Sequence, residues 1–75
     1  NWRMDIQTIR NLEIDYKKLA VAREEKGLTQ AQAAREIGID RRILWQYENG
    51  KALPLENFAK LMLFYGKTIE FFVGK

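Results

Sequence analysis

The stretch that most constrains the fold runs from residue 29 to residue 50 and has the pattern of two short helices joined by a tight turn. The run T-Q-A-Q opens it as a capping box, because Gln32 follows three residues after Thr29. Gly38 supplies the turn, and Asp40 is a good N-cap for the second helix. The pattern therefore predicts helices over 29–37 and 40–48.

The second of these helices has two different faces when its residues are placed about 100° apart on a wheel. Its apolar face consists of Ile43, Leu44 and Tyr47. The opposite face carries Arg41, Arg42, Trp45, Gln46 and Asn49. Arginine can pair with the O6 and N7 atoms of guanine, and glutamine with N6 and N7 of adenine. The residues thus suit the reading of base edges, although a solvated helix face has the same amphipathic pattern.

Three further helices are predicted around this pair. Asp15 is the expected N-cap of a helix that runs to Lys26, with Gly27 as its left-handed cap. Another helix starts at Pro54, where a missing N–H costs nothing, and ends at Gly66. Its expected buried stripe is Leu55, Phe58, Leu61, Met62 and Tyr65. The last helix is expected over Ile69–Val73, between Thr68 and Gly74, with a strand as the competing interpretation.

Residues 1–14 form an N-terminal extension to a domain over residues 15–75. Ile6, Ile9 and Leu12 are spaced as in a helix, whereas Met4 with Ile6, and Leu12 with Ile14, alternate as in short strands. Both interpretations are kept, and residues 1–3 could also derive from a tag or be disordered.

The composition excludes several kinds of site. The 75 residues include no cysteine and no histidine, so disulfides, thiol chemistry and the commonest metal ligand are missing. We therefore expect no enzyme activity, no metal and no cofactor. No apolar run is long enough to span a membrane, and the expected location is the cytoplasm. The net charge of +3 is only weak support for a nucleic-acid partner.

Two spaced motifs stand out in the chain. The pattern L-x-x-x-R-x-x-x-G-[LW]-[ST]-Q is matched by Leu19, Arg23, Gly27, Leu28, Thr29 and Gln30. The pattern I-x-x-[IWY]-E-N-G-K is matched by Leu44, Tyr47, Glu48, Asn49, Gly50 and Lys51. With these motifs the chain, from Tyr16 to Gly74, resembles the Xre-type helix-turn-helix family, which includes the lambda and 434 phage repressors. The resemblance implies an all-α, compact five-helix domain that binds double-stranded DNA and regulates transcription, most simply as a repressor.

The resemblance also implies a role for individual residues. Contacts with bases are expected from Arg41, Arg42, Gln46 and Trp45. Contacts with phosphates are expected from Gln30, Asn49, Lys51 and Arg23. Arg23 and Glu48 match a pair that the family uses as an internal salt bridge. Two residues depart from the family, since Trp45 replaces a small or polar residue and Asp40 would repel a nearby phosphate.

The expected partners follow from the same resemblance. Family members usually dimerise on palindromic DNA, with the apolar candidates for an interface here being Leu53, Met62, Phe64, Phe71, Phe72 and the N-terminal extension. Two alternatives differ in kind. One is an antitoxin that binds its own promoter and a toxin protein, with residues 1–14 as the toxin contact. The other is a protein-interaction module that has kept the fold and lost DNA. No small-molecule ligand is evident.

Overall fold

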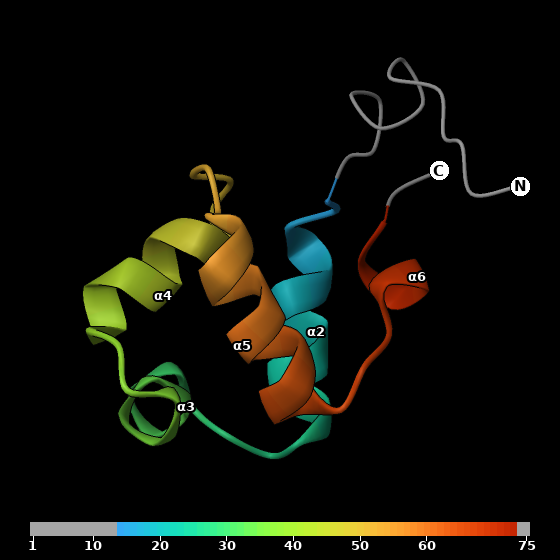
Figure 1. The fold of residues 1–75 in the computed structure, drawn as a ribbon. Coiled ribbons are helices and arrows are strands. Elements are labelled where there is room, and N and C mark those ends of the chain that lie inside the picture. Colours follow the sequence, from blue (N-terminus) through green and yellow to red (C-terminus); the bar gives the residue numbers. More distant parts are fainter. Residues whose placement is uncertain (1–13, 74–75) are drawn as a thin grey trace, which may run out of the picture.

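The computed structural model describes residues 14–73, and within them it is all-α with five helices (Figure 1). The helices are α2 (Lys17–Glu25), α3 (Gln30–Ile37), α4 (Arg41–Glu48), α5 (Leu55–Tyr65) and α6 (Ile69–Phe72). The predicted fold class is therefore confirmed. The predictions for residues 1–13 and for a stop at Gly74 lie outside the described residues. In this part of the chain, no helix has the length and apolar character needed to cross a bilayer.

Short-range signals set the ends of α3 and α4 as predicted. The Thr29 side chain accepts a bond of 3.1 Å from the Gln32 N–H, and the Thr29 N–H donates to the Gln32 side chain at 2.9 Å. These two bonds complete the capping box. Asp40 caps α4 by accepting from the Arg42 N–H at 2.7 Å. Gly38 takes a φ of 93°, a left-handed conformation that a residue with a Cβ rarely adopts.

The first helix of the domain, α2, starts one residue later than an N-cap at Asp15 predicts. The residue before its first helical residue is Tyr16, but the capping bond expected of Asp15 is present, since Asp15 Oδ1 accepts from the Lys17 N–H at 3.2 Å. The Asp15 N–H donates to the Phe72 carbonyl at 2.7 Å, next to an antiparallel bridge between Ile14 and Val73. This pairing holds the backbone just before α2, which begins at Lys17. The alternative prediction, a C-terminal strand, is met within residues 14–73 only by this single bridge at Val73.

The core lies where α2, α4, α5 and α6 converge. Its largest fully buried side chains are Leu19, Leu44, Leu61 and Phe72. The rings of Phe58 and Phe72 meet edge to face with their centroids 5.5 Å apart, which ties α6 to α5. On α3, the buried residues Ala33 and Ala34 are small enough to let its neighbours approach closely. The core thus holds the back of α4 fixed.

Two expectations about burial were wrong. Leu55 was expected in the buried stripe of α5, but it is 80% exposed because the core side of that helix is formed by Phe58, Leu61 and Tyr65. Phe72 was expected at an interface, but it is fully buried because α6 folds back against α2. Phe71 is partly covered, since the ammonium groups of Lys18 and Lys67 lie 5.0 and 4.7 Å from its ring centroid.

Candidate nucleic-acid interface

The two faces of α4 differ sharply in burial, as its sequence predicts. Leu44 and Tyr47 are buried against the core, and Ile43 is half-buried beside them. On the other side, the Arg42 side chain is 85% exposed and Trp45 is 53% exposed. Since the apolar face fixes the helix, the polar face is presented to solvent in one orientation.

The outer face of α4 borders an open hollow of about 390 Å³. Its lining consists of Gln30, Arg41, Arg42, Trp45 and Gln46. Four of these residues come from α4, and Gln30 comes from the first turn of α3. The structure therefore gathers in one place all four residues that were expected to contact bases and one expected to contact a phosphate. The hollow is flanked by two guanidinium groups and an indole ring, a composition that suits an anionic, aromatic ligand such as nucleic acid.

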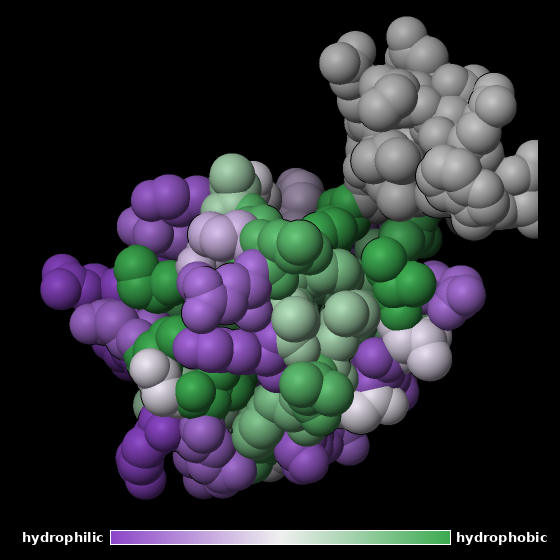
Figure 2. Space-filling model, viewed as in Figure 1, coloured by the Kyte–Doolittle hydropathy of each residue, from purple (hydrophilic) through white to green (hydrophobic). Residues whose placement is uncertain are grey.

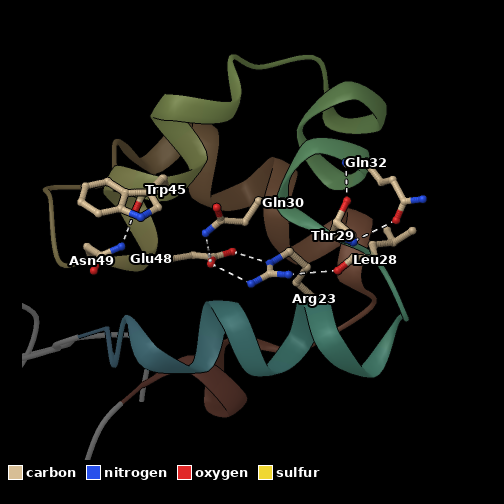
Figure 3. Close-up of polar contacts among 8 residues, drawn as sticks. All are labelled: Arg23, Leu28, Thr29, Gln30, Gln32, Trp45, Glu48 and Asn49. Carbon is tan, nitrogen blue, oxygen red and sulfur yellow. Dashed lines mark hydrogen bonds and ion pairs between the residues drawn. The ribbon is translucent and has the colours of Figure 1, made fainter.

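A hydrogen-bonded network holds the C-terminal end of α4 (Figure 3). Glu48 accepts from Arg23 Nε at 2.9 Å, from Arg23 Nη2 at 3.1 Å and from Gln30 Nε2 at 2.9 Å. Arg23 Nη1 also donates to the Leu28 carbonyl at 3.0 Å. The network joins α2, the start of α3 and the end of α4, so it sets the angle at which the helix-turn-helix presents its outer face.

The ion pair at the centre of this network is buried. The side chains of Arg23 and Glu48 are only 12% and 4% exposed. The hydrogen bond to Glu48 raises the pKa of Arg23 above its ordinary value, against the lowering effect of burial. Arg23 was also expected to contact a phosphate, but each of its nitrogens already donates within the protein. The geometry therefore favours its internal role.

Gln30 is oriented by its bond to Glu48. A carboxylate can only accept, so the amide nitrogen of Gln30 faces Glu48 and its carbonyl oxygen faces away. This contact spans eighteen residues of sequence, and no local pattern signals it. The backbone N–H groups of Gln30 and Ala31 have no acceptor within the described residues. They open the first turn of α3, where the helix dipole favours an anion.

Asn49 and Lys51 lie just beyond α4 and contact its outer face. Asn49 Nδ2 donates to the Trp45 carbonyl at 2.8 Å, and Lys51 Nζ donates to Gln46 Oε1 at 3.3 Å. The lysine therefore lies beside one of the expected base-reading groups. Neither contact was predicted from the sequence.

Asp40 lies close to the guanidinium group of Arg42. Arg42 Nε is 3.7 Å from Asp40 Oδ1, and both side chains are exposed, at 85% and 57%. An exposed pair at this distance contributes little, on the order of 0–1 kcal/mol. Arg42 is therefore free to leave Asp40 for a stronger partner.

Tyr65 was predicted only as part of the buried hydrophobic stripe of α5, but its side chain also carries a polar hydroxyl group. It is 7% exposed, and its hydroxyl has no hydrogen-bond partner among the described residues. Burial, together with the negative charge of Glu48, raises the pKa of Tyr65 to about 12. The phenol is thus a neutral neighbour of the Arg23–Glu48 pair.

Comparison with known proteins agrees with this arrangement. The model of a helix-turn-helix family matches residues 19–72, from α2 to the end of α6. No curated protein and no solved structure gives a significant match. The family match covers well over half of the 75 residues. The chain belongs to the Xre/lambda repressor-like helix-turn-helix family and is a DNA-binding domain of the kind found in transcription regulators.

Proposed function

We propose that this protein is a sequence-specific transcriptional repressor that inserts α4 into the major groove of a palindromic operator. The observation that carries the proposal is the open hollow formed by Gln30 and the outer face of α4. Its cationic and amide side chains are the ones that pair with base edges and phosphates. A repressor of this kind acts by occupying its operator and excluding polymerase.

The proposed division of contacts follows the geometry. Arg41 and Arg42 lie in the first turn of α4, the part of a recognition helix that reaches deepest into the groove. Gln46 lies one turn further on and reads a neighbouring base, with Trp45 against a sugar or a thymine methyl group. Each good bidentate contact contributes roughly 1–3 kcal/mol of discrimination against the wrong base.

The phosphate contacts are proposed at the two ends of this face. At one end, the free N–H groups of Gln30 and Ala31 point out of α3 and are favoured by the helix dipole. At the other end, Asn49 and Lys51 follow α4 directly. Lys51 can pass from Gln46 to a phosphate, since its side chain is exposed and its present bond is a long one of 3.3 Å.

The protein is proposed to act as a homodimer, because one recognition helix reads only a few base pairs. Two copies related by a twofold axis read two half-sites about 34–36 Å apart, one turn of B-DNA. Dimerisation then explains how a short helix selects one operator among many similar sequences.

Selection of bound duplexes from a random DNA pool tests the proposal. The expected result is a recovered consensus with two inverted half-sites about one helical turn apart. The Arg42→Ala variant, with Arg35→Ala on the exposed part of α3 as the matched control, should lose preference at one position of each half-site. Recovery of no consensus by the wild-type chain would remove the proposed sequence-specific function.

A further inference from the structure

The outer side of α5 carries an apolar stripe that the core covers only in part. Leu55 and Leu63 are 80% and 84% exposed, the largest values among the exposed large hydrophobic residues of the described chain. Ala59 and Met62 lie between them and are half-buried. At about 100° per residue, these four side chains span an arc of about 100° on α5. A band of hydrophobic side chains is visible over this helix (Figure 2).

The stripe adjoins the core face of α5 at Met62 but is centred elsewhere on the helix. Phe58, Leu61 and Tyr65 face the core, and the centre of that face lies about 120° from the centre of the stripe. None of the residues that line the hollow belongs to α5. A partner on this stripe therefore leaves the proposed DNA-binding face open.

The charges beside the stripe are arranged to complement a second copy of the same helix. Glu56 and Lys60 are exposed and form no ion pair within residues 14–73. They lie on one flank of the stripe, at about 100° and 140° from Leu55 on the wheel. In an isologous pair, the flanks of the two helices that meet are identical.

We propose that a second copy of this chain packs on the stripe with its α5 antiparallel, around a twofold axis at Ala59. This places Leu55 of each copy opposite Leu63 of the other, with the small Ala59 side chains where the helices come closest. With a rise of about 1.5 Å per residue, Glu56 lies about 4.5 Å before the axis and Lys60 about 1.5 Å after it. Each Glu56 is then offset by only about 3 Å along the axis from Lys60 of the second copy.

The size of the stripe determines how strong this association is. A helix of eleven residues is about 16 Å long, so the contact buries less than the 1,200–2,000 Å² of a typical stable interface. The free chain therefore self-associates weakly, with a Kd between about 10 µM and 1 mM. This inference rests on the proposed homodimer, in which two adjacent half-sites would hold the copies at high effective concentration.

Sedimentation equilibrium of the full chain, without DNA and up to about 1 mM, tests the pairing. Leu63→Glu should abolish self-association, whereas Val21→Glu, at an exposed apolar residue of α2, should leave it unchanged. Circular dichroism should show both variants folded, since both positions are exposed. A wild-type chain that stays monomeric at 1 mM, or a Leu63→Glu variant that associates as wild type does, would overturn the proposal.

Charge exchange distinguishes the proposed pairing from nonspecific hydrophobic association. Glu56→Lys and Lys60→Glu should each weaken association roughly tenfold, because the symmetry repeats every repulsive contact. The double exchange should restore it, and a mixture of the two single variants should associate more tightly than either alone. Failure of both the double exchange and the mixture to recover association would contradict the antiparallel register.

The same variants separate this proposal from the proposed function. On a duplex with one half-site, Leu63→Glu should bind as wild type does, since α5 lies outside the hollow. A wild-type chain that self-associates in the predicted pattern but binds no duplex would support the surface and remove the proposed function. A chain that binds a half-site normally but never self-associates would support the proposed function and remove the proposed pairing surface.

Discussion

The two ends of α4 differ in the burial and hydrogen bonding of their side chains. At its C-terminal end, Glu48 is buried and accepts three hydrogen bonds from Arg23 and Gln30. At its N-terminal end, Arg42 is exposed and has only a distant contact with Asp40. A helix that is held by buried bonds at one end and carries exposed side chains at the other can present unpaired donors at a fixed angle. The difference predicts that substitutions at the buried end change stability, and that substitutions at the exposed end change DNA recognition.

The largest effect is expected from Glu48→Ala. The change leaves Arg23 charged and buried without its partner, which typically costs about 3–5 kcal/mol. A chain of 75 residues has a stability of about 4–11 kcal/mol, so the variant should be close to unfolding. Urea denaturation followed by circular dichroism measures the loss.

The control for this prediction is a variant that removes both charges, Arg23→Met with Glu48→Leu. It should regain most of the lost stability, because replacing a buried pair by apolar groups is often neutral or better. A loss below about 1 kcal/mol in Glu48→Ala would show that the network does not lock this end of α4.

The next effect is expected on the outer face of α4, from Arg42→Ala or Gln46→Ala. Each should lower the preference for the selected operator by about 1–3 kcal/mol. Neither should change the free energy of unfolding by more than about 0.5 kcal/mol, because Arg42 is exposed, Gln46 is only half-buried, and both lie outside the core. Fluorescence anisotropy with operator and scrambled duplexes measures the first quantity, and urea denaturation the second. A variant that binds all sequences as wild type does would contradict the assignment of that residue.

A smaller effect is expected at alkaline pH from Tyr65. Its pKa is raised to about 12 in the folded state, from 10.0 when unperturbed. The stability that this shift contributes is fully present below pH 10 and is lost as the pH rises through 12. The free energy of unfolding of the wild type should therefore fall by up to about 2 kcal/mol more than that of Tyr65→Phe.

The matched comparison is the difference between wild type and Tyr65→Phe at each pH, since lysines also lose their charge in this range. At neutral pH the two proteins should be nearly equally stable or the variant slightly more so, because the hydroxyl has no partner to lose. If the free energies of unfolding of the two proteins changed in parallel between pH 9 and 12, Tyr65 would ionise as freely in the folded chain as in the unfolded chain. That result would contradict the prediction.

The smallest effect is expected from Lys51→Ala. Loss of one phosphate contact should weaken binding to all sequences and reduce the slope of log K against log salt by about one unit. Because Lys51 Nζ also donates to Gln46 Oε1, the variant should alter the preference at the base that Gln46 reads. An unchanged salt slope would place Lys51 away from the phosphates.

The helices could be predicted from the sequence because their ends depend on neighbouring residues. The capping box at Thr29, the cap at Asp40 and the glycine turn at Gly38 are local signals, and the structure shows all three. The two faces of α4 follow from its periodicity. Asp15 also makes its expected capping bond, to the Lys17 N–H, whereas its backbone pairing with Phe72 joins distant parts of the chain and was not predicted.

The arrangement of the candidate site depended more on tertiary structure. The salt bridge between Arg23 and Glu48 was expected from the family resemblance, whereas the bond from Gln30 to Glu48 was not. The burial of Phe72 and the exposure of Leu55 depend on how α6 folds back, which hydrophobicity alone does not reveal. Sequence thus indicated which residues could contact DNA, while the structure showed which of them share one hollow.

The most direct test of the central claim is an NMR titration of the ¹⁵N-labelled chain with a duplex selected from the random pool. The account predicts that the largest shift changes fall on residues 41–46 and on the first turn of α3, with little change on α6. Changes confined to α5 and α6, or none along the outer face of α4, would contradict the claim that this face binds DNA.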